Sequence, residues 1–242
     1  MPEAAVKHVP GRGRFITFEG GEGSGKSTQI RKLSERLNGA KLRNIVTREP
    51  GGSPGAEIMR HLVLSGMGKL LGPDAETLLF AAARDDHVRT VIQPALNQGT
   101  WVLCDRFFDS THAYQGRVGH VAPGILNAMQ RVTIGDLKPD LTIILDVPVQ
   151  VGLKRAAARR GNGEPDRFEA EDVTFHEDLR KAYRQIAAAD PTRCVLIDAS
   201  ADQDVVATQV WTTVRDHLFT VAPAASPTAA APTAAAPTVA TS

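Results

Sequence analysis

The chain has 242 residues, of which 42% are hydrophobic, and its 28 basic and 27 acidic residues leave a formal net charge of +1. This length and composition fit one α/β domain with a substantial core, and two small domains are the less favoured division. The even charge balance gives no case for nucleic-acid binding. The N-terminal stretch lacks the apolar segment of a signal peptide, and no run of about 18 apolar residues occurs. We therefore expect a soluble, cytoplasmic protein without a membrane partner.

Strand-like and helix-like segments alternate from Arg14 onward. The predicted strands are Arg14–Glu19, Asn44–Thr47, Thr100–Asp105, Asp140–Asp146 and Arg193–Asp198. The predicted helices cover roughly residues 26–38, 54–65, 74–98, 123–134, 148–160, 169–189 and 203–219. Short apolar strands separated by helices predict a five-stranded parallel sheet covered on both faces, which is a three-layer αβα sandwich. Ligands of such sheets bind at the carboxyl ends of the strands.

The two ends of the chain differ from this domain, which we place at residues 14–221. Residues 1–13 are predicted to form a flexible arm. Residues 222–242 contain only Ala, Pro, Thr, Ser and Val, so they have neither charge nor aromatic residues with which to build a core. We predict a disordered tail, and a role as a linker or docking segment stays open.

The segment Phe18–Thr28 (FEGGEGSGKST) carries the strongest functional signal. It satisfies the P-loop pattern G-x-x-x-x-G-K-[ST], with a predicted strand before it and a predicted helix after it. Its glycines allow successive N–H groups to point at one anion, Lys26 adds charge on the β- and γ-phosphates, and Ser27 supplies a hydroxyl ligand for Mg²⁺. We therefore predict a P-loop NTPase fold that binds a nucleoside triphosphate. The loop residues expected to hold its phosphates are Gly20, Gly21, Glu22, Gly23, Ser24, Gly25, Lys26, Ser27 and Thr28.

Two further strand ends carry charged residues. Arg48 and Glu49 precede the turn Pro50–Gly52, and an arginine there is suited to a phosphate, although the sequence Glu-Pro-Gly-Gly is also simply a good turn. Asp105 and Arg106 end the third strand. An acid at a strand tip near a P-loop is the expected second contact to Mg²⁺, and Arg106 is suited to bridging two phosphates. A solvent-exposed ion pair is the alternative.

Two polar and aromatic clusters are candidates for holding a base and a sugar. Phe80 and Arg84 lie four residues apart and share one helical face, although a lone phenylalanine is more often core. The run Ser110–Gly116 (STHAYQG) surrounds one aromatic residue with short polar groups, which suits hydrogen bonds to a base, and the start of a polar helix looks similar.

The segment Lys154–Arg167 (KRAAARRGNGEPDR) gathers arginines around Gly161-Asn162-Gly163. Phosphoryl transfer needs positive charge over the γ-phosphate and the exclusion of water, so we predict a mobile basic lid at about residues 154–167. A solvated helix end is the alternative. The histidines show no zinc-ligand spacing, and Cys104 and Cys194 lie in apolar runs typical of buried cysteines.

Taken in order, these elements resemble the thymidylate kinase family of nucleoside-monophosphate kinases. The resemblance covers Arg14 to about Leu218. It rests on the segments FEGGEGSGKST (18–28), TREPGG (47–52), FAAAR (80–84), DR (105–106), STHAYQG (110–116) and PDLTIILDV (139–147), and on the arginine-rich segment that ends at Asp166-Arg167. Some family members carry an arginine in the P-loop. This chain instead has the acid Glu22 and lid arginines, so it resembles the bacterial form in which the lid supplies the charge.

The resemblance implies ATP-dependent phosphorylation of dTMP to dTDP, which feeds dTTP synthesis, with Mg²⁺ and with a homodimer formed by helix packing. It implies that Phe80 stacks on thymine, that Arg84, Thr111 and Gln115 contact its polar edge, and that Tyr114 lies against the 2′-carbon. The implied dTMP-binding residues are Arg48, Glu49, Phe80, Arg84, Arg106, Ser110, Thr111, Tyr114 and Gln115. The implied catalytic residues are Lys26, Asp105, Arg106, Arg159 and Arg160, with Ser27 and Asp105 at the metal; whether Arg159 or Arg160 reaches the γ-phosphate stays open.

Other classes of function explain the residues less well. Another P-loop kinase, such as a UMP/CMP-type kinase, is the alternative enzyme. A GTPase requires a guanine-reading N-K-x-D element, which the sequence lacks. A non-catalytic nucleotide-binding module does not require the intact set of Lys26, Ser27 and Asp105.

Overall fold

The computed structural model describes residues 12–67, 70, 72–161, 163–164 and 167–219. Most of the predicted N-terminal arm, the predicted tail and three positions of the predicted lid (162, 165 and 166) lie outside the described residues.

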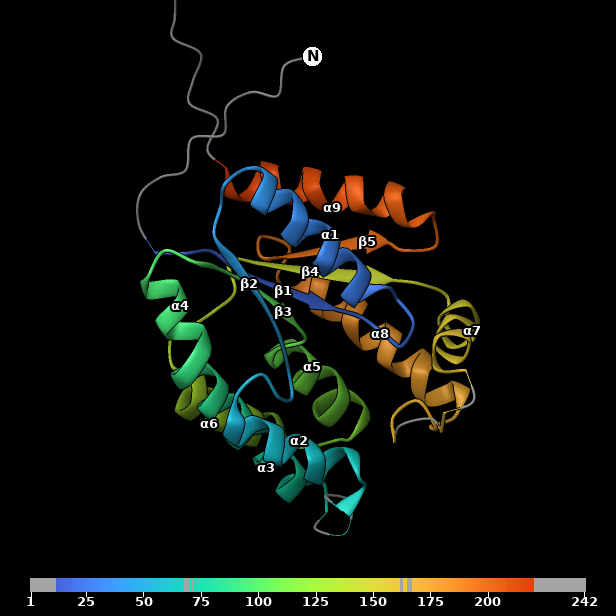
Figure 1. The fold of residues 1–242 in the computed structure, drawn as a ribbon. Helices are drawn as coiled ribbons and strands as arrows, with labels where there is room; N and C mark the ends of the chain where they lie inside the picture. Colours follow the sequence, from blue (N-terminus) through green and yellow to red (C-terminus); the bar gives the residue numbers. More distant parts are fainter. Residues whose placement is uncertain (1–11, 68–69, 71, 162, 165–166, 220–242) are drawn as a thin grey trace, which may run out of the picture.

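A parallel sheet forms the centre of the molecule (Figure 1). Its strands are β1 (Phe15–Glu19), β2 (Asn44–Arg48), β3 (Trp101–Asp105), β4 (Leu141–Asp146) and β5 (Cys194–Asp198). The five strands lie in the order β2-β3-β1-β4-β5, and every neighbouring pair is parallel. This confirms the predicted P-loop NTPase fold. The order places β1 between β3 and β4, so the loop after β1 lies next to the carboxyl ends of both.

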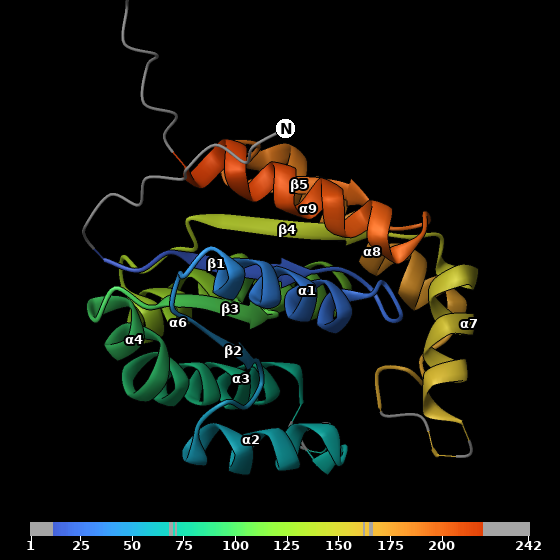
Figure 2. The same cartoon turned by 45° about the horizontal axis from the view of Figure 1, so that its top comes forward.

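Helices cover both faces of this sheet (Figures 1 and 2). One face carries α1 (Lys26–Gly39) and α9 (Gln203–Leu218), which contact each other. The other face carries α4 (Gln93–Asn97), α5 (Phe108–Thr111), α6 (Pro123–Ile134) and α8 (Val173–Ala189), with α2 (Pro54–Leu64) packed on α3 (Pro73–His87) further out. Helix α7 (Val149–Arg160) stands at the edge where the strands end (Figure 2).

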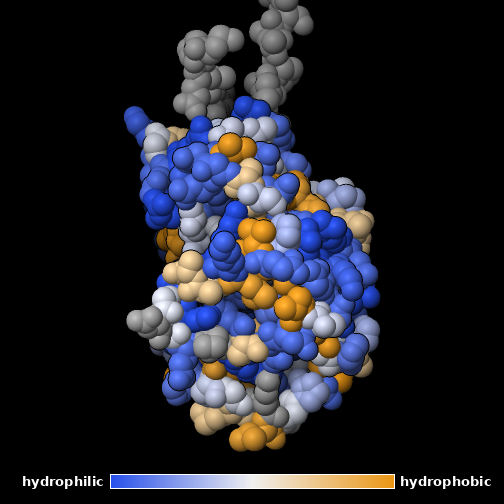
Figure 3. All heavy atoms as spheres, turned by 90° about the vertical axis from the view of Figure 1, so that its right-hand side faces the viewer, coloured by the Kyte–Doolittle hydropathy of each residue, from blue (hydrophilic) through white to orange (hydrophobic). Residues whose placement is uncertain are grey.

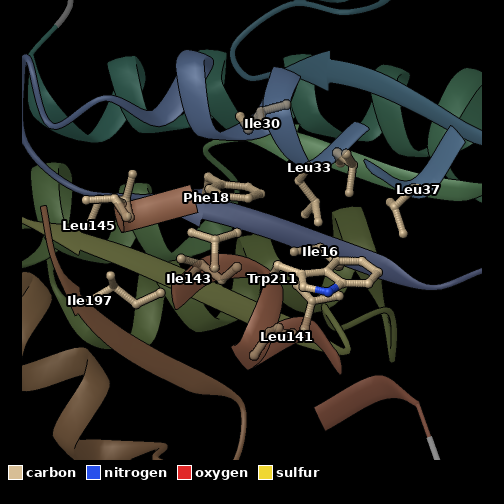
Figure 4. Packing of buried hydrophobic residues seen from close by; sticks show 14 of the residues in the cluster. Ile16, Phe18, Ile30, Leu33, Leu37, Leu141, Ile143, Leu145, Ile197 and Trp211 are labelled. Atoms are coloured by element: carbon tan, nitrogen blue, oxygen red, sulfur yellow. The ribbon is translucent and has the colours of Figure 1, made fainter. Parts of the chain in front are cut away.

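The alternation of side chains along β1 builds both cores. Ile16 and Phe18 point to the side of α1, where they pack with Ile30 and Leu33 (Figure 4). Phe15 points to the opposite side and joins a second cluster. Burial on both faces explains why the three central strands, β1, β3 and β4, read as nearly continuous apolar runs.

The predicted helix 74–98 is one helical run with a widened turn. The π-helical segment η2 (Val88–Ile92) joins α3 to α4, and the Gln93 N–H donates to the carbonyl of Val88, five residues back. Pro94 follows directly, and a proline ring clashes with the carbonyl four residues before it, so a wider turn at this point relieves that clash.

Residues 108–118 form helical structure that the sequence analysis did not predict. Helix α5 continues into the π-helical segment η3 (His112–Val118). The apolar residues here lack a regular 3.6-residue spacing, which is why no helix was predicted. The buried side chains of this run include Asp109 and Gln115, and their burial depends on partners from other elements.

Candidate active site

A cavity of about 310 Å³ opens at the carboxyl ends of β1, β2 and β3. Most of the side chains predicted for the site line it: Glu22–Thr28, Arg48, Glu49, Phe80, Arg84, Asp105, Arg106, Ser110, Thr111, Tyr114, Gln115 and Arg159. Three predicted residues are not on its wall, namely Gly20, Gly21 and Arg160. Figure 3 looks onto the side where α7 lies, and that side is mostly hydrophilic with apolar patches near its centre.

The P-loop residues Gly20–Ser27 connect β1 to α1 as a compact turn. The ammonium of Lys26 donates to the carbonyls of Gly20 (3.1 Å) and Gly21 (3.0 Å), so it lies over its own loop. Burial lowers the pKa of Lys26. Gly25 has φ +93°, a conformation that favours glycine, and α1 begins directly after it. The helix N-terminus thus faces the cavity, as an anion site requires.

Gly23 lies against the backbone of α7. A Cβ atom at Gly23 would come within 1.9 Å of the carbonyl oxygen of Gly152, and one at Gly152 within 2.4 Å of the carbonyl oxygen of Glu22. No side chain fits between the loop and this helix. The P-loop and α7 therefore make direct backbone contact.

The two residues predicted for the metal lie together. The Ser27 hydroxyl donates to Asp105 Oδ2 at 2.9 Å, although 78 positions separate them in the sequence. Both are hard oxygen donors of the kind that Mg²⁺ prefers. Among the described residues no group of three or more His, Cys, Asp or Glu side chains gathers as a metal site. A Mg²⁺ ion here would therefore complete its coordination with phosphate oxygens and water.

Arg106 lies at the centre of the polar site. Its backbone has φ +68°, unusual for a residue with a side chain, and its N–H donates to the carbonyl of Phe18. Its Nη2 donates to Glu22 Oε1 (2.7 Å), which also accepts from the Tyr114 hydroxyl (3.2 Å). Burial alone would raise the pKa of Glu22, but the charges of Arg106 and Lys26 outweigh it and lower that pKa to about 2. Glu22 is therefore a carboxylate at neutral pH.

Glu19 stands behind Arg106, and the sequence analysis did not single it out. Its Oε1 accepts from the N–H groups of Phe107 (2.8 Å) and Ser110 (3.2 Å), so it caps α5 from another element. Burial, together with the nearby Asp109 carboxylate, raises the pKa of Glu19 to about 7. Glu19 is fully buried, and in the sequence it reads only as the last residue of a strand.

Arg84 is held by the buried acid Glu49, which also contacts the buried side chain of His87. Its Nε donates to Glu49 Oε2 at 2.7 Å, and Glu49 Oε1 lies 3.1 Å from His87 Nδ1. Arg84 Nη2 donates to Thr111 Oγ1 at 3.0 Å, which aims the guanidinium toward the cavity. Both oxygens of Glu49 are thus engaged by protein groups. Glu49 also lines the cavity, and its predicted role in substrate binding stays a prediction.

Aromatic side chains form one wall of the cavity. Phe80 is half-buried on α3, and the ring of Tyr114 packs edge-on to Phe168 with centroids 5.1 Å apart. The guanidinium of Arg106 lies 5.1 Å from the centre of the Tyr114 ring. Gln115, on the same helical run as Tyr114, donates to Glu76. Sequence reasoning missed Phe168, which follows the arginine-rich segment and carries no pattern of its own.

The arginines on the β2 side are tied to their surroundings. Arg48 donates to Glu57 Oε1 at 3.0 Å on a half-exposed surface. Arg60 also lines the cavity and donates to the carbonyl of Pro50 at 2.7 Å. The sequence analysis missed Arg60 because an arginine on an amphipathic helix looks like an ordinary solvated residue.

The predicted lid arginines point in different directions. Arg159 and Arg160 both pair with Glu169, at 2.8 and 2.7 Å, but only Arg159 lines the cavity. Arg155 donates to the backbone carbonyls of Ala199 and Ser200 after β5. The lid arginines therefore do not act as one group in this structure.

A second cavity, of about 470 Å³, lies on the other side of the P-loop. It shares Gly23–Gly25, Thr28 and Arg159 with the first cavity, and Arg155, Ala199 and Asp202 lie on its wall. Two hollows thus meet at the phosphate loop, with Arg159 at the boundary.

A family model described as thymidylate kinase matches residues 18–210, which is most of the chain. The chain belongs to the thymidylate kinase family. It is 76% identical over 218 residues to the thymidylate kinase of Nitrobacter hamburgensis, covering 90% of this chain and 95% of that relative. It is 74% identical over 218 residues to the thymidylate kinase of Bradyrhizobium diazoefficiens (90% and 96%). The thymidylate kinase of Afipia carboxidovorans is 63% identical over 224 residues (93% and 98%).

Membership of the thymidylate kinase family confirms the resemblance drawn from the ordered sequence segments. Within the described ranges, the molecule contains no helix with the length and apolar character needed to cross a bilayer.

Proposed function

We propose that this member of the thymidylate kinase family transfers the γ-phosphoryl group of ATP to dTMP between two cavities that meet at the P-loop. The observation that carries the residue assignment is the pair of cavities that meet at the P-loop. In-line transfer needs donor and acceptor on opposite sides of one phosphoryl group. The cavity beside Arg155 is assigned to ATP and the cavity beside Phe80 to dTMP.

The acceptor cavity offers groups for each part of dTMP. Phe80 supplies a face for stacking on thymine, while Arg84, Thr111 and Gln115 supply polar contacts to its edge. Tyr114 would lie against the 2′-carbon, so that a ribose hydroxyl would clash with it. The wall position of all these side chains supports the assignment.

The reaction itself requires little covalent chemistry from the protein. A phosphate oxygen of dTMP attacks the γ-phosphorus, the bond from that phosphorus to the bridging oxygen breaks, and ADP leaves. The acceptor phosphate is largely ionised near neutral pH, so no strong general base is needed. Lys26, Arg106 and Arg159 place positive charge around the transferred group as its charge redistributes. Arg159 is favoured over Arg160 because it alone of the two lies on the cavity wall.

Mg²⁺ belongs to this proposal, held by Ser27 and Asp105. When bound, it neutralises the β- and γ-phosphate oxygens and fixes their orientation. The hydrogen bond between these two side chains brings their oxygens close enough to share one ion with the phosphates.

A homodimer and a cytoplasmic location complete the proposal. Ile58 on α2, Leu78 on α3 and Val132 on α6 are large apolar side chains exposed on helices that pack in series. A second copy on these helices would cover them. Light scattering should give twice the chain mass, and Val132→Asp should shift the mass toward the monomer; a monomeric wild-type protein would refute the dimer.

A coupled assay of ADP release tests the function directly. Acceptors dTMP, dUMP, UMP, CMP, AMP and GMP are compared at fixed ATP and Mg²⁺. We expect kcat/KM to be highest for dTMP and the ribonucleotide UMP to be poorly used. Equal or better use of UMP or CMP would overturn the substrate assignment in favour of a UMP/CMP-type kinase.

A further inference from the structure

Three acceptors hold one nitrogen of the Arg106 guanidinium, Nη1. This nitrogen donates to the carbonyl of Gly20 (3.1 Å), to Ser110 Oγ (3.4 Å) and to the hydroxyl of Tyr183 (3.1 Å). Tyr183 belongs to α8 and is 2% exposed, so its hydroxyl is removed from solvent. It lies outside the acceptor cavity, since it does not line the wall.

Glu19 orients the two hydroxyls that Arg106 meets. The Ser110 hydroxyl donates to Glu19 Oε2 at 2.6 Å, and the Tyr183 hydroxyl donates to the same oxygen at 3.0 Å. Each hydroxyl has one hydrogen and two lone pairs. When Glu19 is ionised, both hydroxyl hydrogens are directed to its carboxylate, and the lone pairs are left to accept from Arg106. An acid, two hydroxyls and a guanidinium thus form one directed network.

This network fixes the direction of the other guanidinium nitrogen. A guanidinium is planar and rigid, so holding Nη1 sets where Nη2 points. Nη2 donates to Glu22 Oε1, and Glu22 lies on the cavity wall. A side chain anchored on its rear side reaches the cavity with little freedom left to lose on binding.

We propose that Tyr183, acting with Glu19, is a positioning residue that orients Arg106 for phosphoryl transfer. The proposal rests on the proposed role of Arg106 at the transferred phosphoryl group. Tyr183 touches no substrate itself. It connects α8, which follows the lid segment in the chain, to the arginine that directly follows β3.

Tyr183→Phe is the direct test, because it removes one hydroxyl and keeps the ring that packs with Leu179 and Ile144. Loss of a hydrogen bond to a charged group commonly corresponds to about a 10-fold change. We expect kcat to fall about 10-fold, KM for ATP to stay within about two-fold, and the melt to remain cooperative. A kcat within about two-fold of wild type would overturn the proposal.

Thr17→Val is the matched control. Thr17 is fully buried on β1, and within the described part of the chain its hydroxyl forms a hydrogen bond with Thr142 Oγ1 at 2.7 Å. The variant loses a buried hydroxyl without touching Arg106. It should lower the melting temperature and leave kcat unchanged. If kcat fell equally in both variants, the effect of Tyr183→Phe would come from a general loss of stability, and the positioning role would be overturned.

A double-mutant cycle separates this inference from the proposed role of Arg106. Arg106→Lys should lower kcat strongly, and adding Tyr183→Phe should then cost much less than it does in the wild type. If Arg106→Lys alone had no effect, the proposed role of Arg106 would fail. If Arg106→Lys lowered kcat and the effects of the two substitutions on kcat were independent, the proposed role of Arg106 would stand and the positioning role of Tyr183 would be refuted.

Discussion

Replacing Glu19 by glutamine removes a fully buried ionisable acid and keeps the size of the side chain. In the folded protein, burial and the Asp109 charge raise the pKa of Glu19 from its ordinary value of 4.5 to about 7, against the opposing effect of Arg106. Between these two values the folded state holds a proton that the unfolded state has released. The stability that Glu19 contributes is therefore complete below pH 4.5 and is lost as the pH rises through 7.

The magnitude follows from the two pKa values. The interval between 4.5 and about 7 corresponds to a free energy on the order of 3 kcal/mol. The Glu19→Gln variant has no ionisable group there, so it should lack this decline. The free energy of unfolding of the variant minus that of the wild type should rise by about this amount between pH 4.5 and 8.

Urea unfolding followed by circular dichroism at pH 5, 6, 7 and 8 measures this difference. Glu22 does not disturb the comparison, because its lowered pKa of about 2 places its own titration effect below pH 4.5 and it is present in both proteins. Thr17→Val, which removes a buried hydroxyl from the same strand, should give a difference that is independent of pH. Parallel stability curves for Glu19→Gln and wild type would refute the reasoning.

Three further predictions follow from the site. Lys26→Ala should lower kcat by about 100-fold or more while the thermal melt stays cooperative, because the ammonium stabilises charge that develops in the reaction. A kcat within a few-fold of the wild-type value would refute the assignment of the P-loop. Tyr114→Ala should bring the kcat/KM values for dUMP and UMP closer together, whereas Phe80→Ala should lower both values by about 10-fold. If Tyr114→Ala left the ratio of the two kcat/KM values unchanged, Tyr114 would be a core residue and not part of the sugar site. Gly23→Ala should destabilise the fold by about 2 kcal/mol or more, because its Cβ would meet the Gly152 carbonyl at 1.9 Å with φ at +65°. Gly124→Ala, whose Cβ would meet nothing within 4 Å, should be close to neutral in the same thermal melt.

The sheet was predictable because local sequence determines it. The central strands β1, β3 and β4 are short apolar runs, and their burial on both faces leaves no polar alternation that would suggest a surface strand. The P-loop was predictable for a different reason, since its chemistry requires specific residues at fixed spacing.

The unpredicted parts depend on contacts between distant segments. The helical run Phe108–Val118 owes its burial to neighbours such as Glu19 and Tyr183, which lie on other elements. Tyr183 looks like an ordinary core residue on an amphipathic helix. Arg155 looked like part of a lid, but it binds backbone carbonyls after β5, and that partner cannot be read from a string of arginines.

The backbone contact between Gly23 and Gly152 is a fixed point near the start of α7, and any tilt of this helix would turn about it. Because backbone meets backbone there, no side chain can change rotamer to absorb a sideways shift of α7 against the P-loop. Arg159 lies seven residues further on, a lever of about 10 Å at 1.5 Å per residue. A tilt of about 20° would swing its backbone by about 3–4 Å, roughly the reach of one hydrogen bond. A rotation of that size about the glycine contact would therefore be enough to change whether Arg159 reaches the boundary between the two cavities.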